Sequence, residues 1–555
     1  MPARAIEITF AQLNPTVGDI EGNASRMLRV WKEYQRTSDL IVFPELFLCG
    51  YPPEDLVLNA TFAKSLKDKI EELCALSRDF KGAALIPTAW EENNTIYNAA
   101  LLIEKGEILH IFYKHKLPNN YVFDEPRTFT PGPMPKPFTF KGYALGIMIC
   151  EDIWHLEVPS YLKQYGAQIL IAINGSPFHI YQEGERRAVA CEAVRETGLD
   201  LIYLNMIGGQ DELVFDGRSF IMQANRKEKY KAPAFEEDIV SIILETDKKN
   251  NVILSLNNNK EIKEPLHETG LLYKALVTSV RDYVYKNSFQ KILLGLSGGI
   301  DSALTAAIAT DALGASHIRT IMLPSEFTAK ESIEDARACA AMLNVSCETI
   351  PINAIVESFE HAIENLSGTA HENTQSRTRS TVLMALSNMT GALLLTTGNK
   401  SEVAVGYCTL YGDMSGGFNP LKDIYKTEVY KLAAWRNAQS QVIPERILTK
   451  APTAELRAMQ KDEDTLPPYE LLDDILRLLI DYDNVNWDSA PSVLKEMRDK
   501  CLEHPQTIEK ISTMLQNNEH KRFQAAPGTR ISIRGFGKDR RYPITNHFVN
   551  KIEKS

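Results

Sequence analysis

Short apolar runs alternate with polar segments throughout residues 1–245. The apolar runs are rich in β-branched residues and are bounded by turn-forming residues, which is the pattern of strands. They cover residues 39–46, 82–90, 98–104, 143–150, 167–174 and 199–205. Because the polar segments between them are helical or turn-rich in composition, the pattern predicts an α/β domain built in layers.

The second half begins with apolar residues at helical spacing over 271–287. A strand at 291–298, a helix at 301–314 and a strand at 317–324 follow, and a right-handed crossover of this kind implies a parallel sheet. Residues 246–267 between the halves are polar and Asn-rich, typical of a surface connection with room for one short strand. The sequence therefore predicts a domain at 1–245, a linker at 246–267 and a second domain at 268–555.

Length and composition limit the class of protein. At 555 residues the chain exceeds the size at which one hydrophobic core stops growing. Its 44% hydrophobic and 24% charged residues are ordinary for a globular protein, and no run approaches the ~18 apolar residues of a membrane span. The first residues lack the apolar core of a signal peptide. We expect a soluble protein that stays in the cytoplasm and does not bind membranes.

Charge and cysteine spacing exclude two further classes. A formal net charge of −11 argues against a general nucleic-acid binder, since phosphate contacts need clustered Lys and Arg. Eight cysteines stand without CxxC spacing, so neither a disulfide framework nor a zinc site is indicated. A small-molecule substrate fits this composition better.

A glycine-rich loop lies between the predicted strand at 291–298 and the helix after it. Backbone amides at such a junction, together with the positive end of the helix, suit an anionic phosphate. The loop is not of the GxxxxGKS/T type because no Lys precedes Ser302. It resembles the SGGxDS loop of ATP pyrophosphatases, which hold pyrophosphate and adenylate an acid; by itself, a plain glycine turn opening a core helix is the alternative. Its residues are Gly295, Leu296, Ser297, Gly298, Gly299, Ile300, Asp301 and Ser302.

Four long stretches strengthen the first interpretation. Residues 372–388, 394–413, 416–437 and 450–473 closely resemble the synthetase domain of the glutamine-dependent NAD synthetases, and with the first-half motifs the resemblance covers nearly the whole chain. It implies a doubly wound parallel-sheet domain of the adenine-nucleotide α-hydrolase type. It also implies that deamido-NAD is adenylated by ATP on its nicotinate carboxylate and that ammonia then displaces AMP to give NAD.

The resemblance assigns residues to this reaction. Asp301 and Glu402 are hard oxygen donors that could share Mg²⁺ with the ATP phosphates. Lys426 alone could equally be a solvated helix lysine. The ATP-binding positions implied are the loop 295–302 with Thr397, Lys426 and Thr453, and those for deamido-NAD are Asn373, Glu402, His520 and Lys521.

Three short motifs carry the chemistry of the first half. Glu45 in FPEL, Lys114 in YKHKLPN and Cys150 in GIMICEDIW match the nitrilase-like amidases, which fold as αββα sandwiches. In that family Glu is the general base, Lys stabilises the oxyanion and Cys attacks the amide, and a thiol needs such partners because it is only slightly ionised at neutral pH. Alone, Cys150 would be an inert core thiol and Glu45 a turn residue. Lys114 is preferred to Lys116 because the family lysine lies three residues before the Leu of LPN.

Further matches point to glutamine as the amide donor. They are Ser176 in NGSPFH and the segment 208–217. Two departures affect this assignment: Asn120 stands where the family has Tyr, with Tyr121 after it, and Gln182 stands where a Lys follows the serine by six residues. With these four residues as the predicted glutamine site, the chain either binds glutamine less tightly, uses a neighbour such as Tyr121, or takes another donor.

Other functions stay open at this stage. GMP and asparagine synthetases share the loop type, but the glutaminase of the latter needs a cysteine after the initiator Met, where this chain has Pro2. The first domain could be a silent module beside an ammonia-dependent synthetase. Alternatively, an amidase could carry a nucleotide-sensing domain, which detection of AMP and pyrophosphate would exclude.

We expect the two domains to cooperate. Ammonia is mostly protonated at neutral pH and is then no nucleophile, so we expect an enclosed passage between the two sites and coupling of their rates. The resemblance also implies homo-oligomers in which synthetase domains pair.

Overall fold

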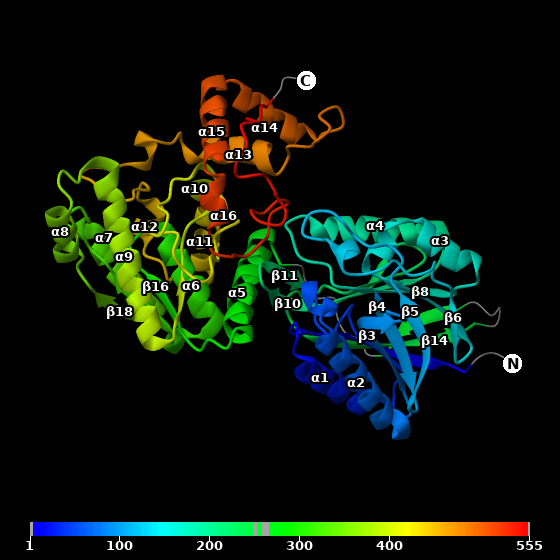
Figure 1. Cartoon of the computed structure of the whole chain (residues 1–555). Coiled ribbons are helices and arrows are strands. Elements are labelled where there is room, and N and C mark those ends of the chain that lie inside the picture. The colour runs from blue at the N-terminus through cyan, green and yellow to red at the C-terminus, as the bar shows by residue number, and fades with distance from the viewer. Residues whose placement is uncertain (1–3, 248–251, 258–265, 553–555) are drawn as a thin grey trace. The chain divides into compact units, whose positions relative to one another are not determined.

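A computed structural model of the chain describes residues 4–247, 252–257 and 266–552 (Figure 1). The chain forms two compact units. The first comprises residues 1–210 and 214–266, and the second comprises residues 211–213 and 267–555.

Two sheets build the first unit. The seven-stranded sheet has the order β15-β14-β1-β2-β3-β4-β5, and the six-stranded sheet has the order β13-β12-β9-β8-β7-β6. The strands of the first sheet are β1 (Ile6–Gln12), β2 (Leu40–Val42), β3 (Ala83–Glu92), β4 (Thr95–Glu104), β5 (Glu107–Tyr113), β14 (Asp238–Thr246) and β15 (Val252–Leu256). Those of the second are β6 (Phe138–Phe140), β7 (Tyr143–Ile149), β8 (Ile169–Asn174), β9 (Leu201–Asn205), β12 (Phe220–Met222) and β13 (Glu228–Lys231). A separate pair is formed by β10 (Ile207–Gln210) and β11 (Leu213–Asp216).

Helices cover the outer face of each sheet. Trp31 of α1 is buried and donates from Nε1 to the carbonyl of Gly82, just before β3, at 2.8 Å. On the second sheet, Met148 and Leu170 pack against Val194 of α4. The helices of this unit are α1 (Ile20–Tyr34), α2 (Ala60–Leu76), α3 (Glu157–Gln164) and α4 (Gln182–Thr197), with the short turns η1 (Glu54–Leu58), η2 (Ser77–Asp79), η3 (Glu125–Arg127) and η4 (Cys150–Trp154).

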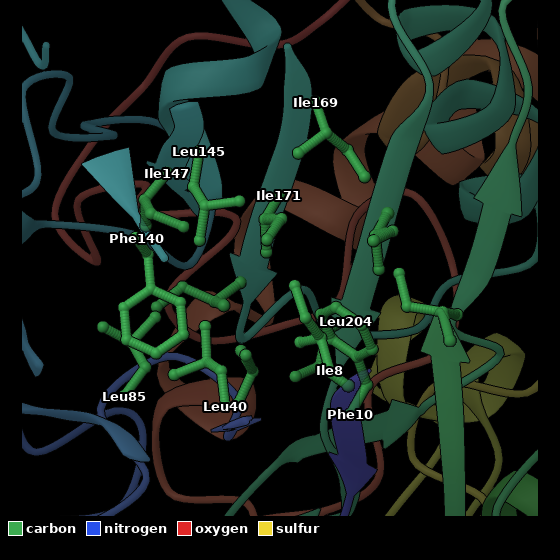
Figure 2. Packing of buried hydrophobic residues seen from close by; sticks show 14 of the residues in the cluster. Ile8, Phe10, Leu40, Leu85, Phe140, Leu145, Ile147, Ile169, Ile171 and Leu204 are labelled. Carbon is green, nitrogen blue, oxygen red and sulfur yellow. The ribbon is translucent and has the colours of Figure 1, made fainter. Parts of the chain in front are cut away.

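The main core of the first unit lies between the two sheets (Figure 2). Apolar side chains at every second strand position face inward, as the two-residue period of a strand requires. Those labelled in Figure 2 are Ile8, Phe10, Leu40 and Leu85 from the first sheet and Phe140, Leu145, Ile147, Ile169, Ile171 and Leu204 from the second. The order of layers is therefore helix, sheet, sheet, helix.

The six strands predicted in the first half are all present as β2, β3, β4, β7, β8 and β9. The short strand expected between the domains is present as well. It is β15, which pairs antiparallel with β14 and thus belongs to the first unit's sheet. The first unit therefore extends beyond residue 245, while residues 248–251 and 258–265 of the predicted linker lie outside the described residues.

The second unit is built on a four-stranded parallel sheet of order β18-β17-β16-β19. Its strands are β16 (Ile292–Gly295), β17 (Ile318–Met322), β18 (Ser346–Thr349) and β19 (Leu393–Leu395). Its helices and short turns are α5 (Glu268–Lys286), α6 (Ile300–Leu313), η5 (Ala315–His317), α7 (Lys330–Leu343), α8 (Asn353–Ala362), α9 (Gly368–Thr390), α10 (Lys400–Val405), α11 (Lys426–Gln439), α12 (Glu445–Thr449), η6 (Asp462–Asp464), α13 (Tyr469–Ile480), α14 (Ser492–Leu502), α15 (Pro505–Asn517) and α16 (Glu519–Phe523). In the part of the chain that the structure describes, no helix is long and apolar enough to cross a bilayer.

The strand order of this sheet reverses at β16. The chain runs from β16 to β17 and β18 on one side and returns to β19 on the other. The loops that leave the carboxyl ends of β16 and β19 therefore diverge, and ligands of doubly wound sheets bind in the crevice at such a switch point. These are the loops that carry residues 295–302 and 396–402.

A buried lysine anchors the chain beyond α16. Lys400 begins α10, has no exposed side-chain area, and forms ion pairs with Asp423 at 2.9 Å and Asp481 at 3.1 Å. It also donates to Ser532 Oγ at 2.7 Å and to the carbonyl of Arg534 at 2.8 Å. A buried ammonium is tolerated only when paired in this way, so the C-terminal segment completes the surroundings of α10.

Candidate active sites

A buried lysine joins two carboxylates in the first unit. Glu45 follows β2 and Lys114 follows β5, and neither side chain is exposed. Lys114 Nζ lies 2.8 Å from Glu45 Oε1 and 2.8 Å from Glu125 Oε1. Glu45 Oε1 also accepts from Asn98 Nδ2, and Glu45 Oε2 accepts from the amide of Gly175, each at 2.7 Å. Both oxygens of Glu45 are therefore fixed, as a positioned base requires.

Cys150 stands at the turn between β7 and η4. Its φ of 48° is unusual for a residue with a side chain, and only 4% of it is exposed. Burial raises the pKa of the Cys150 thiol, the Glu45 carboxylate raises it further, and the Lys114 ammonium opposes both. The thiol consequently keeps its proton until a base removes it, and Glu45 is the fixed carboxylate that acts on it most strongly.

The structure separates the two candidate lysines. Lys114 lies in the cluster with Glu45, whereas Lys116 forms an ion pair with Glu157 and keeps 29% of its side chain exposed. Asp152 connects this segment to the cysteine turn, since its Oδ1 accepts from the amide of Lys116 at 2.8 Å and its Oδ2 accepts from the amide of Ile149 at 3.0 Å. Asp152 thus ties together the two chain segments that carry Lys114 and Cys150.

Glu125 is a site residue that the sequence analysis missed. It lies in η3, where Tyr51 OH donates to its Oε1 at 3.0 Å and Lys114 donates to the same atom. Burial raises the pKa of Glu125 from 4.5 to about 7, although Lys114 opposes the rise. The available signal was an acid eleven residues after Lys114, at the end of the VFDE segment, but spacing alone does not show that the loop folds back on the lysine.

The predicted glutamine residues fall into two groups. Ser176 and Gln182 are buried, and Gln182 Nε2 lies 3.4 Å from Ser176 Oγ. Asn120 and Tyr121 lie instead on an exposed turn, where half of Tyr121 is accessible and its φ is 51°. The structure therefore brings the first pair beside Gly175, the residue that contacts Glu45, and does not bring the second pair into the buried cluster.

The glycine-rich loop of the second unit runs from β16 into α6, as predicted. Ser302 Oγ donates to the carbonyl of Gly299 at 3.0 Å, and the amide of Ser297 donates to Ser302 Oγ at 3.2 Å. Gly298 has a φ of 83°, and a Cβ there would lie 2.2 Å from the carbonyl oxygen of Ser332. Only glycine fits this position, where the loop turns into the N-terminus of α6.

Three predicted residues of the second unit meet around one ammonium. Lys426 at the start of α11 is 3% exposed, with Nζ 2.5 Å from Asp301 Oδ2 and 3.1 Å from Glu402 Oε1. Asn399 connects the same carboxylates, because its Nδ2 donates to Asp301 Oδ1 and its Oδ1 accepts from the amide of Glu402, each at 3.0 Å. Lys426 is thus buried between two carboxylates and is not a solvated helix lysine.

Burial and charge shape the ionisation of this cluster. Burial raises the pKa of Glu402 to about 7, against the opposing effect of Lys426. Asp462 was not predicted, yet Tyr469 OH donates to its Oδ2 at 2.9 Å and lies 3.5 Å from Glu402 Oε1. Burial also raises the pKa of Asp462. Its motif, KDED, has no spacing that would have singled it out from an ordinary acidic turn.

The donor set suits Mg²⁺ held together with phosphate. Within the described ranges no group of three or more His, Cys, Asp or Glu side chains is arranged to hold a metal by itself. Asp301 and Glu402 offer two hard oxygen donors at the edge of the glycine-rich loop, and Mg²⁺ is usually bound by one or two carboxylates plus substrate phosphates. The two carboxylates therefore fit the ion as partners of ATP.

Asp473 of α13 fixes the start of both helices that carry this cluster. Its Oδ1 accepts from Ser401 Oγ at 2.5 Å, and its Oδ2 accepts from the amide of Thr427 at 2.9 Å. Ser401 Oγ in turn accepts from the amide of Lys426 at 2.9 Å. Asp473 is fully buried and thereby sets the separation between Glu402 and Lys426.

The remaining predicted nucleotide residues lie on several different segments of the second unit. Thr397 follows β19 and is half-buried. Thr453 donates to the carbonyl of Gln460 at 2.6 Å, and Asn373 of α9 accepts from Thr409 at 2.9 Å. The last two belong to α16: Lys521 donates to the carbonyls of Gly406 and Cys408 at 2.7 and 2.8 Å, whereas His520 is exposed.

Comparison with known proteins identifies the family of each half of the chain. Residues 7–247 match the carbon-nitrogen hydrolase family model, and residues 272–525 match the NAD synthase family model. The glutamine-dependent NAD(+) synthetase of Rhodobacter capsulatus is 42% identical over 558 residues, which cover 98% of each chain. The chain belongs to the glutamine-dependent NAD(+) synthetase family. The enzyme of that name from Aquifex aeolicus is 41% identical over 98% of this chain and 100% of its own.

A solved structure of this NAD(+) synthetase family supports the fold along the whole chain. The glutamine-dependent NAD+ synthetase of Acinetobacter baumannii, solved with ADP, has a TM-score of 0.75 at 36% identity and covers 99% of this chain and 100% of its own. The predicted fold class, a nitrilase-like αββα sandwich followed by a doubly wound parallel-sheet domain, is thereby confirmed.

Proposed function

We propose that this chain makes NAD from deamido-NAD, ATP and glutamine, as an ATP-dependent carbon–nitrogen ligase with glutamine as the amido donor. The observation that carries the proposal is the pairing of two lysine-centred sites in a chain with full-length relatives of that function: Glu45 and Lys114 beside Cys150, and Asp301 and Lys426 beside the glycine-rich loop. The proposed functional limits are a glutaminase at 1–245, a linker at 246–267 and a synthetase at 268–555, although β15 of the linker pairs with the glutaminase sheet.

The first half-reaction uses the buried cluster of the first unit. Glu45 takes the proton of Cys150, whose sulfur attacks the side-chain amide carbon of glutamine. Lys114 stabilises the oxyanion that forms, because its ammonium is already held between two carboxylates and needs no reorganisation. The carbon–nitrogen bond then breaks as Glu45 returns the proton to the leaving nitrogen, and ammonia departs. Water, activated by Glu45, hydrolyses the thioester to glutamate.

The second half-reaction uses the switch point of the second unit. The nicotinate carboxylate attacks the α-phosphorus of ATP, pyrophosphate leaves against the loop 295–302 at the N-terminus of α6, and ammonia then displaces AMP from the adenylate. Asp301 and Glu402 would hold Mg²⁺, which when bound neutralises charge on the phosphates. Lys426 supplies a positive charge beside both carboxylates. Thr397, Thr453, Asn373, His520 and Lys521 remain proposed contacts of the two nucleotides.

Passage of ammonia between the sites stays part of the proposal. Protonated ammonia does not attack an adenylate, so an enclosed route would preserve the nucleophile. Binding at the synthetase site should then raise glutaminase turnover. The glutaminase rate with and without ATP and deamido-NAD measures this coupling, and an unchanged rate would remove it.

The deciding experiment compares the two nitrogen sources. NAD formation is measured with glutamine or ammonium in the native protein and in Cys150→Ala. Cys191→Ala is the matched control, because Cys191 is a half-buried cysteine of the same unit. Cys150→Ala should lose the glutamine-dependent reaction and keep the ammonium-dependent one, while the control keeps both. Ammonium-only activity in the native protein would make the first unit silent, and no NAD from either source would refute the substrates.

Homo-oligomer formation and a cytoplasmic location also remain proposals. An exposed apolar surface supports the first: Ile355 and Phe359 of α8 are 40% and 43% exposed, and Met384 and Met389 of α9 are 38% and 80% exposed. The side of α9 that is buried carries polar residues such as Gln375 and Thr378. Farther along α9, Val382, Leu383 and Leu386 pack against the core of the unit, so the exposed Met384 and Met389 are apolar residues outside that core. Together with the exposed side chains of α8 they fit an interface with a second copy. Sedimentation of the Phe359→Asp and Met389→Asp variants tests this assignment. Variants that form an oligomer of the same size as the native protein would contradict it.

A further inference from the structure

A buried arginine stands behind the proposed glutamine serine. Arg186 of α4 is 3% exposed and forms an ion pair with Asp216, with Nη1 2.7 Å from Oδ1. Its Nη2 donates to the carbonyl oxygens of Ser176 and Pro177 at 2.7 and 3.0 Å, and its Nε donates to Ser176 Oγ at 3.0 Å. One side chain therefore holds both the backbone and the hydroxyl of Ser176.

The neighbouring contacts leave this segment no freedom. Asn205 Oδ1 accepts from the amide of Ser176 at 2.9 Å, and Asn205 Nδ2 donates to its carbonyl at 3.1 Å. The preceding residue, Gly175, donates to the base Glu45. Because adjacent Cα atoms are about 3.8 Å apart, Ser176 lies one short step from the reacting end of the site.

The donors around Ser176 decide how its hydroxyl can be used. A guanidinium has five donors and no acceptor, so Ser176 Oγ must accept from Arg186. Gln182 Nε2 approaches the same oxygen at 3.4 Å. A hydroxyl has two acceptor lone pairs and one hydrogen, and with its lone pairs facing these two donors the remaining capacity is that of a donor. Ser176 is thereby left with one hydrogen to donate, which the neighbouring Tyr203 hydroxyl or a bound oxygen acceptor can take.

We propose that Arg186 positions the Ser176 hydroxyl as a hydrogen-bond donor to the α-carboxylate of the amide donor, and so performs through the serine the recognition that a cation at position 182 would give directly. This inference rests on the proposed assignment of Ser176 to glutamine. The amide oxygen of the substrate is taken by Lys114, so the carboxylate is the strong acceptor left at the other end of the glutamine molecule. Asp216 balances the charge of Arg186, so the buried ion pair carries no net charge.

The test compares two donors that differ only at the carboxylate. Glutaminase kcat/KM is measured for glutamine and for glutamine whose α-carboxylate is converted into an amide. In Arg186→Gln, kcat/KM for glutamine should fall on the order of 10- to 100-fold, mainly through KM, as expected for one charge-assisted hydrogen bond. The value for the α-amide should change far less. Arg187→Gln is the matched control, since Arg187 is the next residue of α4 and is 45% exposed.

Two more variants keep the proposal open to refutation. Arg186→Lys preserves the charge and the fold but cannot reach both Ser176 Oγ and the two carbonyls, so glutamine use should fall by an intermediate factor. Adding Gln182→Lys to Arg186→Gln should restore the preference for a free carboxylate. Equal losses for both donors, or no loss for either, would overturn the inference. Absence of any glutaminase activity in the native protein would instead overturn the proposed function on which it rests.

Discussion

Glu125 should lower the stability of the first unit above neutral pH, because the site keeps a carboxyl group where water cannot reach it. Burial raises its pKa from 4.5 to about 7 in the folded state. A carboxyl with a raised folded pKa contributes stability that is full below the unfolded pKa and is lost as pH rises through the folded one. The window of loss is therefore about pH 4.5 to 7.

Glu125→Gln removes the titrating group while keeping the shape and the oxygen that accepts from Lys114 and Tyr51. At about 1.4 kcal/mol per pH unit, the difference between 4.5 and about 7 corresponds to about 3 kcal/mol. The stability of the variant minus that of the native protein should thus rise by about 3 kcal/mol as the pH goes from 4 to 8. Its glutaminase rate should fall, since the lysine loses one charged partner.

Hydrogen exchange of peptides from β7 and β8 measures the opening free energy of this unit without requiring the whole chain to unfold in one step. Peptides from β16 and β17 provide the internal comparison. Glu107→Gln is the matched control, because Glu107 is an exposed glutamate of the same unit. Parallel pH profiles for the native protein and Glu125→Gln would refute the reasoning, since they would mean that Glu125 ionises as it does in water.

Two predictions concern the second unit. Gly298→Ala should cost about 1–3 kcal/mol in backbone strain and displace the loop from Ser332, so ammonium-dependent NAD formation should collapse. Gly184→Ala is the control, because a Cβ there meets nothing within 4 Å. Equal rates for the two variants would contradict the prediction. Asp473→Asn should lose the bond to the Thr427 amide, worth about 1–3 kcal/mol for a buried group, and so lower ammonium-dependent kcat/KM for ATP about tenfold or more. An unchanged ATP dependence would show that Asp473 does not fix Glu402 and Lys426.

Much of the fold followed from local pattern. The inward strands of the first unit are short runs of Ile, Leu and Val with a period of two, and the switch-point loop is marked by two adjacent glycines. Such signals are local because they depend on the backbone geometry of a few neighbouring residues. For the same reason the strands that precede Glu45 and Cys150, and the loop that leads to Asp301, were predicted at the right positions.

Long-range closure was the part that local pattern did not contain. Glu125 and Asp462 are acidic residues of irregular loops, and only the folded chain brings them to Lys114 and Tyr469. β15 gave a strand signal, but its place in the first unit's sheet depends on the register with β14. Arg186 was hidden in a charged helix segment, because nothing in the sequence distinguishes a buried arginine from its exposed neighbour Arg187.

The buried amine of Lys400 has a consequence for the order in which the protein matures during translation. Four groups satisfy it, and two of them, Ser532 Oγ and the carbonyl of Arg534, are synthesised long after the whole first unit. A nascent chain folds its N-terminal unit first. A ribosome-bound chain can thus possess a finished cysteine site while the ATP-using site still lacks its last supports. A nonsense mutation shortly before Ser532 should accordingly yield a partial enzyme that consumes glutamine without making NAD.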